Sequence, residues 1–328
     1  MLGLGLGISY RGGGGTRPAL DLNFLGGSLD SRVTFTRASA GWAYNSAGTL
    51  TSYAINTPRF DYDPVTLAAK GLLIEEARTN LFLNSATGVT QSVTVTAAAH
   101  TLSFFGTGTI TLTGTSTAGP LVGTGAANRV TLTFTPTAGA LTLTVSGSCT
   151  NVQLELGSFA SSPIVTVGST VTRAADVATI TTLGPWYSST AGALVAEYSL
   201  LYVKPTGLQI AAQLDDATPS TNRIGLFAVG STGAANVSIT TATVAQFSNN
   251  HAAAVAGTTT KLAVTYTTND VISALNGTLS ALDTSVTLPV VTQLRIGHRG
   301  ADYLNGYIRR IRLWRSRLVN TTLQDLTA

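Results

Sequence analysis

Alternation of apolar and hydroxyl-bearing residues is the feature that most narrows what this chain can fold into. The segments 130–135 and 141–145 place valine, leucine or phenylalanine at every second position, with threonine between them, and 152–156 alternates apolar residues with glutamine and glutamate. A period of two is that of a β-strand with one buried face. Sheets with one buried face pack in pairs, so these segments predict an antiparallel β-sandwich.

The same periodicity returns in the last third of the chain. The segments 194–200, 224–228 and 262–266 again alternate, and Asn276-Gly277 lies between two apolar runs as a two-residue hairpin turn would. We therefore expect an all-β protein, built from antiparallel β-sandwich modules.

Composition narrows the possible functions. Only 10% of the 328 residues are charged and 44% are hydrophobic, which argues against disorder. The single cysteine, Cys149, excludes an internal disulfide and any multi-cysteine zinc site. Three lysines are too few for the broad basic face of a nucleic-acid-binding protein, and no apolar run approaches the roughly 18 residues of a membrane span. We expect no nucleic acid, no membrane insertion, no cofactor and no bound metal.

The N-terminus has an unusual pattern. Leu2, Leu4, Leu6 and Ile8 alternate with glycines, which gives an extended ribbon with one apolar edge. Glycine weakens a strand and permits close approach of another backbone, so residues 1–30 are expected to form an extended anchor that orders against a partner protein. A frayed terminus is the alternative.

Charges and rings are mixed in the stretch between residues 56 and 85. Two functions are open to its charged side chains: a carboxylate pair for glycoside hydrolysis, or a structural ion-pair cluster. The interleaved arginines favour the structural cluster, whose expected members are Arg59, Asp61, Asp63, Glu75, Glu76 and Arg78.

Two long strings in the chain match a known family. The strings PRFDYDP and GLLIEEARTNL, with Arg37-Ala38-Ser39 upstream, resemble a domain of bacteriophage head spikes and fibres and of some tail fibres. The string QLELGSFASSPIVTVGSTVTRAAD resembles the segment that closes a jelly-roll module in the same proteins, although Pro163-Ile164-Val165-Thr166 stands where Tyr-Ile-Pro-Thr is usual. The resemblance implies a structural protein of the virion, joined to other virion proteins and assembled as a homotrimer.

The C-terminal string LNGYIRRIRLWRSRLVNTTLQDL resembles the end of laminin-G-like or concanavalin-like sandwiches. Gly306, Ile308, Ile311 and Leu313 match a Gly-x-Ile-x-x-Val-x-Ile pattern, and the differing parity of Ile308 and Ile311 predicts a β-bulge between them. The expected organisation is an anchor (1–30), a family-specific base (31–85), a jelly roll (86–172) and a laminin-G-like sandwich (173–328).

Candidate ligand-binding residues are few. Aromatic and polar groups in predicted loops of the last module indicate a glycan-binding tip made of Trp186, Tyr187, His298, Arg299 and Tyr303. Trp42 and Tyr44 share one strand face and could stack on a sugar, but packing in a core or subunit interface is the favoured interpretation.

The sequence leaves two kinds of chemistry to consider, calcium binding and catalysis. Asp215 and Asp216, with Asn222, could hold calcium through loop oxygens, although a solvated turn is favoured. The histidines lack the spacing of metal ligands and no serine lies in a nucleophile elbow, so we expect no catalytic residues and no enzyme.

These observations predict a phage fibre or spike on the exterior of the head or tail, whose distal module touches host-surface glycan during adsorption. A purely architectural decoration or connector protein is one alternative. A polysaccharide-degrading tailspike is the other.

Overall fold

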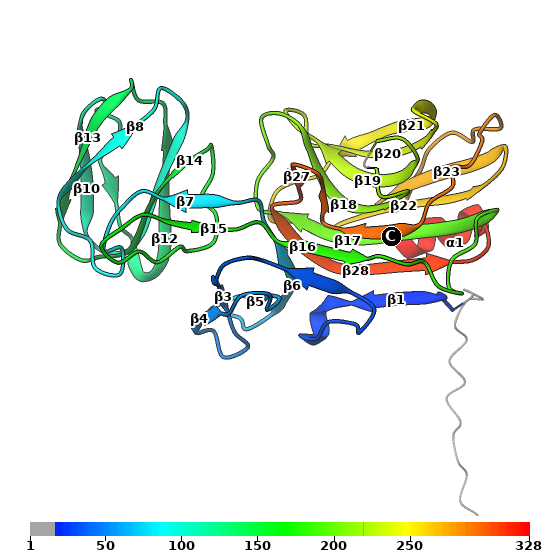
Figure 1. The fold of residues 1–328 in the computed structure, drawn as a ribbon, viewed down its shortest axis with the longest axis horizontal. Coiled ribbons are helices and arrows are strands. Elements are labelled where there is room, and N and C mark those ends of the chain that lie inside the picture. The colour runs from blue at the N-terminus through cyan, green and yellow to red at the C-terminus, as the bar shows by residue number, and fades with distance from the viewer. Residues whose placement is uncertain (1–16, 219) are drawn as a thin grey trace, which may run out of the picture.

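The computed structural model describes residues 17–218 and 220–328, and over these the chain is built almost entirely of antiparallel strands. The all-β, antiparallel prediction is therefore confirmed. Figure 1 shows a smaller and a larger β-sandwich lying side by side, joined by a two-stranded ribbon of β7 (Arg78–Asn80) and β15 (Val171–Arg173). The predicted anchor residues Leu2, Leu4, Leu6 and Ile8 lie outside the described residues.

The smaller sandwich has two sheets. One has the order β11-β10-β13-β8 and the other β12-β9-β14. The strands are β8 (Gln91–Val95), β9 (His100–Gly106), β10 (Thr109–Gly114), β11 (Leu121–Val122), β12 (Gly125–Phe134), β13 (Gly139–Ser146) and β14 (Cys149–Leu156). The amide of Leu81, just after β7, donates to the carbonyl oxygen of Leu154 at 2.8 Å, which sets the end of β7 beside β14. With β7 included, the strand order is that of a jelly roll.

Alternation decides which residues fill this lobe. Leu102, Phe104 and Leu154 are fully buried between the two sheets, whereas Thr131 and Thr133 on β12 face water. The strand pairs keep apolar side chains on the inner faces because a shift of one residue would expose them.

The larger sandwich faces two broad sheets toward each other. One has the order β24-β23-β22-β17-β28-β6-β5, with β1 also on β28, and the other β2-β16-β25-β18-β19-β20-β21. The first sheet contains β1 (Leu20–Asn23), β5 (Phe60–Tyr62), β6 (Ala69–Ile74), β17 (Ala191–Leu200), β22 (Thr260–Thr267), β23 (Asp270–Leu275), β24 (Thr278–Leu279) and β28 (Gly306–Trp314). The second contains β2 (Thr34–Thr36), β16 (Val177–Ile180), β18 (Leu208–Asp215), β19 (Arg223–Val229), β20 (Ala234–Thr241), β21 (Val244–Ala253) and β25 (Gln293–Ile296).

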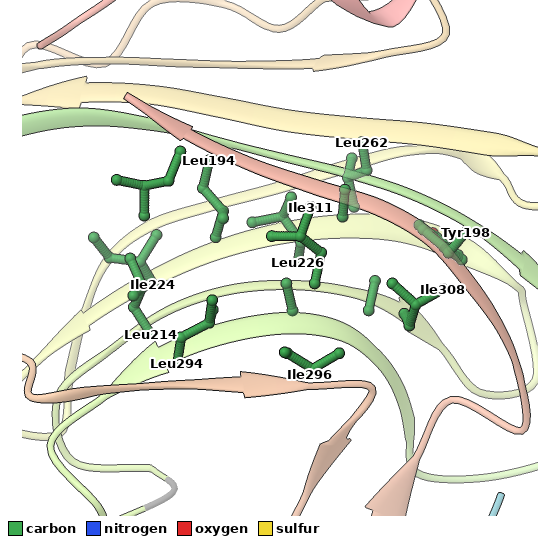
Figure 2. Packing of buried hydrophobic residues seen from close by; sticks show 14 of the residues in the cluster. Leu194, Tyr198, Leu214, Ile224, Leu226, Leu262, Leu294, Ile296, Ile308 and Ile311 are labelled. Carbon is green, nitrogen blue, oxygen red and sulfur yellow. The ribbon is translucent and has the colours of Figure 1, made fainter. Parts of the chain in front are cut away.

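The core of this lobe lies between the sheets. Figure 2 shows Leu194, Ile308 and Ile311 from one sheet meeting Leu226 and Ile296 from the other, all buried. Helix α1 (Asn320–Thr327) covers the outer face of the first sheet, where Leu323 packs in a second apolar cluster. Neither helix in the described part of the chain could span a membrane.

The bulge predicted in the last strand is present. Tyr198 pairs with Ile308 and Glu197 pairs with Arg310, so Arg309 is the extra residue of β28. The insertion lets both Ile308 and Ile311 point into the core.

The expected division at residues 30 and 85 differs from the structure. Strands β1, β2, β5 and β6 complete the two sheets of the larger sandwich instead of forming a separate base. In particular, β28 pairs with β6 and β1 along one edge, while β16 pairs with β2. The physical reason is that the late strands would otherwise leave edges of unpaired backbone groups, which the early strands cover.

Two short hairpins complete the described fold. They are β3 (Gly41–Tyr44) with β4 (Leu50–Tyr53), and β26 (His298–Arg299) with β27 (Asp302–Tyr303). The short 3-10 helix η1 (Phe24–Gly26) follows β1. In Figure 1 the β3–β4 hairpin lies below the junction of the two lobes.

Candidate functional site

A cleft of about 510 Å³ opens where the β3–β4 hairpin, the jelly roll and the larger sandwich meet. The hairpin contributes Trp42 and Tyr44, and the jelly roll contributes Phe105 and Arg129. The larger sandwich and the segment before β15 supply the remaining wall, which includes Asp61, Lys70, Ser161, Ser162 and Tyr307. The cleft is thus a product of the packing of the two lobes.

The two hairpin aromatics lie on one face of β3. Gly41 and Ala43 are buried, while Trp42 and Tyr44 are half-buried and line the cleft. A side chain at Gly41 would come within 3.1 Å of the Arg37 and Arg59 side chains, so the inner face of the hairpin is packed closely on those arginines. This packing turns the aromatic face toward the cleft.

Asp61 ties the hairpin to the larger sandwich. Its carboxylate accepts a hydrogen bond of 2.7 Å from the Tyr44 amide and one of 2.5 Å from the Tyr307 hydroxyl. Burial raises the pKa of Asp61, and the hydrogen bond from Tyr307 opposes that rise. Asp61 is the one carboxylate among the described residues that line the cleft, whereas glycoside hydrolysis by paired acids needs two.

Behind the cleft lies a buried ion-pair cluster, which we call the junction cluster: Arg37, Arg59, Glu75, Arg173 and Asp176. Arg59 reaches Glu75 at 2.8 Å and Asp176 at 2.5 Å, and Arg37 reaches Asp176 at 3.2 Å. Arg173 lies 3.6 Å from Glu75 and 3.8 Å from Asp176. All five side chains are closed to water.

The charges in the junction cluster stabilise one another. Burial alone would raise the pKa of Glu75, but Arg173 and Arg59, with hydrogen bonds from Ser162, lower it to about 2. Asp176 also accepts a hydrogen bond of 2.9 Å from the Glu75 amide. Glu75 is therefore ionised at neutral pH despite its burial.

The junction cluster positions two walls of the cleft. Arg59 donates to the carbonyl oxygen of Trp42 at 3.2 Å and to the hydroxyl of Ser162 at 2.6 Å. Ser162 in turn donates to Glu75 from its amide, at 2.7 Å, and from its hydroxyl, at 2.6 Å. The hairpin strand and the 161–162 segment are thus held at a common buried point.

The six residues expected to form one ion-pair cluster are divided among four places. Only Arg59 and Glu75 belong to the junction cluster, and Asp61 lies in the cleft wall. Glu76 and Arg78 pair separately at 2.7 Å, with Lys204 of the larger sandwich 3.3 Å from Glu76. Asp63 accepts the amides of Val65 and Thr66 in a turn.

Three members of the junction cluster were missed because they are distant in the sequence. Arg37 lies 139 residues from Asp176, and Arg59 lies 117 residues from it. Arg37, Arg173 and Asp176 do stand within the strings that carry the phage resemblance. Their place in these strings was the sequence signal that could have identified these three residues.

The predicted glycan-binding tip is not an open site in the structure. Trp186 is 6% exposed and belongs to the core of the larger sandwich. His298 is 3% exposed and donates to the carbonyl oxygen of Ala178, and burial lowers its pKa to about 4. Neither ring can offer a face to a sugar, because each fills space between packed elements.

The other three residues of the predicted tip make contacts with neighbouring side chains. Tyr187 packs against the main core and burial raises its pKa to about 12. Tyr303 stacks on His298 with ring centres 6.1 Å apart, and Arg299 pairs with Asp302 at 2.8 Å. The β26–β27 hairpin therefore uses Arg299 and Tyr303 for its own packing, and Tyr187 serves the core.

At the possible calcium site, the carboxylates of Asp215 and Asp216 already accept hydrogen bonds from protein side chains. Asp215 is fully buried and accepts from Gln293 at 2.6 Å and from Arg295 at 2.7 Å. Asp216 accepts from Thr218 and, at 2.8 Å, from Asn222 in an exposed turn. Within residues 17–218 and 220–328 no group of three or more histidine, cysteine or acidic residues could hold a metal.

Comparison with known proteins gives only distant likenesses. No family model matches the chain, and no curated protein matches it. Among solved structures, the CBM40 of a Ruminococcus gnavus IT-sialidase is similar at 16% identity and a TM-score of 0.36, over 43% of this chain and 84% of that one. A leech intramolecular trans-sialidase complexed with 2,7-anhydro-Neu5Ac is similar at 15% identity and a TM-score of 0.34, over 43% of this chain and 23% of that one. A SAP-like pentraxin from Limulus polyphemus is similar at 7% identity and a TM-score of 0.34, over 43% of this chain and 70% of that one. Likenesses of this size do not assign a family.

Proposed function

We propose that this chain is a bacteriophage virion protein that binds host-surface glycan, without reacting with it, in the cleft between its two lobes. The protein would project from the exterior of the head or tail as part of a fibre or spike, attached to other virion proteins and trimeric. The strings that resemble phage head spikes and fibres support the virion role, and several of their charged residues build the junction cluster.

One observation carries the glycan proposal: half-buried Trp42 and Tyr44 lie side by side on β3 and line a cleft that also offers polar groups. Aromatic side chains provide a flat apolar surface with a polar tip, and binding sites combine such surfaces with a few fixed polar groups. Asn128 is exposed in the same cleft, and its side-chain amide supplies both donors and an acceptor. Several copies on one particle would strengthen weak individual contacts.

The site differs from the tip expected from the sequence. Trp186 and His298 are buried in the larger sandwich, whereas Trp42 and Tyr44 remain accessible at the seam. The proposal therefore moves the sugar from the far module to the junction between the modules.

An array of bacterial surface glycans tests this proposal. The wild-type chain should bind a subset of the array, and Trp42→Ala should weaken that binding by at least about tenfold. Tyr303→Ala, which removes a ring from the tip that the sequence predicts, is the matched control and should leave binding unchanged. Both variants should be checked for native circular dichroism.

The remaining outcomes separate the alternatives. If Tyr303→Ala lost binding and Trp42→Ala did not, the cleft assignment would be wrong. An array silent for the wild-type trimer would favour a purely architectural decoration or connector protein. The release of reducing ends from host polysaccharide would favour a polysaccharide-degrading tailspike.

A further inference from the structure

Two smaller hollows adjoin the cleft. A hollow of about 270 Å³ shares Tyr44 and Phe105 with it, and one of about 260 Å³ shares Lys70 and Tyr307. Each hollow therefore borders the cleft at the residues that the two have in common. We call the cleft and its two adjoining hollows the seam groove; their walls extend from the jelly roll past the hairpin to the first sheet of the larger sandwich.

The charge along the seam groove is positive. Among the described residues that line its three parts, Lys70, Arg129 and Arg309 are cations and Asp61 is the one carboxylate. Asp61 already accepts hydrogen bonds from Tyr44 and Tyr307, and Lys70 lies 3.9 Å from it. The lysine side chain retains 31% exposure, so its ammonium group can still meet a second anion.

Arg129 lies on the jelly-roll side of the groove. Its guanidinium donates to the carbonyl oxygen of Ser161 at 2.5 Å and to the hydroxyl of Ser103 at 2.8 Å. The buried Glu155 behind this wall offsets part of its charge. The charge without an acidic partner among the described residues therefore lies at the other end, at Arg309, which lines the same hollow as Lys70.

The backbone of β28 gives Arg309 its place. Arg309 is the extra residue of the bulge between Ile308 and Arg310, and bulges re-aim side chains. Its neighbours on the strand are neutralised, since Arg310 pairs with Asp21 at 2.5 Å and Arg312 pairs with Glu197 at 2.7 Å. Arg309 has no ion-pair partner among the described residues and lines the same hollow as Lys70.

We infer that the seam groove takes an anionic polysaccharide, with an acidic group of the sugar chain bound at Lys70 and Arg309. This inference rests on the proposed function and names its ligand class. Cations in a partly enclosed groove attract carboxylate or sulfate groups and reject a neutral chain that leaves them unpaired. The adjoining hollows extend beyond a single cavity, which suits a polymer held at several sugar units.

The test is affinity electrophoresis of the full chain through gels that contain a charged polymer or its neutral counterpart. Alginate is compared with carboxyl-reduced alginate, and dextran sulfate with dextran, so the two arms distinguish carboxylate from sulfate. We expect retardation by at least one charged polymer and none by its neutral form. The double variant Lys70→Ala/Arg309→Ala should weaken that retardation by about tenfold.

The control removes the same charges from another place. Lys261→Ala/Arg315→Ala has the same net charge as the groove variant but changes residues that do not line the groove. Relative to its own migration in a gel without polymer, it should be retarded as strongly as wild type is. Equal losses in both double variants would overturn the inference, because the attraction would then be non-specific. An absence of retardation by every charged polymer would overturn it too.

Failure of the ligand class is distinguishable from failure of the proposed function. If neutral and charged forms bound equally and Trp42→Ala abolished both, the cleft would remain a glycan site and the anionic preference would be wrong. If Trp42→Ala left all binding intact, the proposed function itself would be contradicted.

Discussion

The jelly roll and the junction cluster bury different kinds of side chain. The jelly roll has an apolar core, including Leu102, Phe104 and Leu154, and the segment from 86 to 154 contains a single charged residue, Arg129. The junction instead buries three arginines and two carboxylates beside the cleft. An apolar core tolerates substitutions of similar volume, whereas each buried charge depends on a particular partner.

Two buried glutamates make the same contrast. Burial raises the pKa of Glu155, at the end of the jelly roll, although Arg129 and Ser161 oppose the rise. Burial would also raise the pKa of Glu75, but Arg173 and Arg59 reverse the effect. Burial alone therefore does not set the charge state of a carboxyl group, because the number and distance of the neighbouring arginines decide it. A cleft wall fixed by charges in this way has one preferred geometry.

The largest expected effect comes from removing a carboxylate shared by three arginines. Asp176→Ala should lower the free energy of unfolding by about 3 to 5 kcal/mol, because it leaves buried guanidinium groups uncompensated. Urea unfolding followed by tryptophan fluorescence measures this, since all three tryptophans lie outside the jelly roll.

Asp325→Ala is the matched control for this change. Its carboxylate is exposed on α1, so the free energy of unfolding should stay within about 0.5 kcal/mol of wild type. A similar small change in Asp176→Ala would mean that the junction cluster does not stabilise the fold.

A smaller loss of stability is expected from a substitution in the apolar core of the jelly roll. Leu154→Ala should cost about 3 kcal/mol in the jelly roll, because it opens a cavity in a fully buried core. Calorimetry of the full chain measures the loss. The neighbouring Leu156 is 52% exposed, so Leu156→Ala should change the unfolding temperature far less. Equal shifts in the two variants would argue against the sandwich register described here.

The pH dependence should separate the two glutamates. Because folding lowers the pKa of Glu75 to about 2 from the model-compound value of 4.5, its contribution is present above pH 4.5 and is lost as pH falls toward 2. Glu75→Gln should remove roughly 2 to 3 kcal/mol of that acid-dependent loss.

Glu155 has the opposite sign. A carboxyl whose pKa is raised by folding lowers the stability of the fold as pH rises above its unfolded pKa. Glu155→Gln should therefore reduce the fall in the free energy of unfolding that accompanies this rise in pH. Urea titrations at a series of pH values measure both slopes. Parallel slopes in the two variants would contradict the contrast drawn from their surroundings.

The smallest effect is expected at the contact between the junction cluster and the cleft. Ser162→Ala removes a hydroxyl that lies 2.6 Å from both Arg59 and Glu75, and it should cost about 1 to 2 kcal/mol. Because Ser162 lines the cleft, glycan affinity should fall as well. The control Ser158→Ala changes an exposed residue, and identical affinity in both variants would show that the wall does not depend on this bond.

Much of the fold follows from periodicity. Alternation identified three strands of the jelly roll, β12, β13 and β14, and three of the larger sandwich, β17, β19 and β22. The parity of Ile308 and Ile311 located the bulge. These features depend on local geometry, which a sequence pattern records directly.

Long-range pairing was harder to predict. Nothing in the pattern of Ala69–Ile74 says that it pairs with Gly306–Ile308, more than 200 residues later. The same limit hid the arginines that meet at Asp176, and it hid the burial of Trp186 and His298 in the larger sandwich. The spacing of Trp42 and Tyr44 did reveal a shared face, but the cleft that this face lines exists only because the jelly roll lies beside it.

A crystal structure of the full chain with an alginate oligosaccharide, at a concentration that saturates binding in solution, tests the central claim most directly. The account predicts a sugar ring against Trp42 and Tyr44 and a carboxylate between Lys70 and Arg309. A ligand bound instead at the β26–β27 hairpin, or an empty seam groove in a chain that binds the sugar in solution, would contradict it.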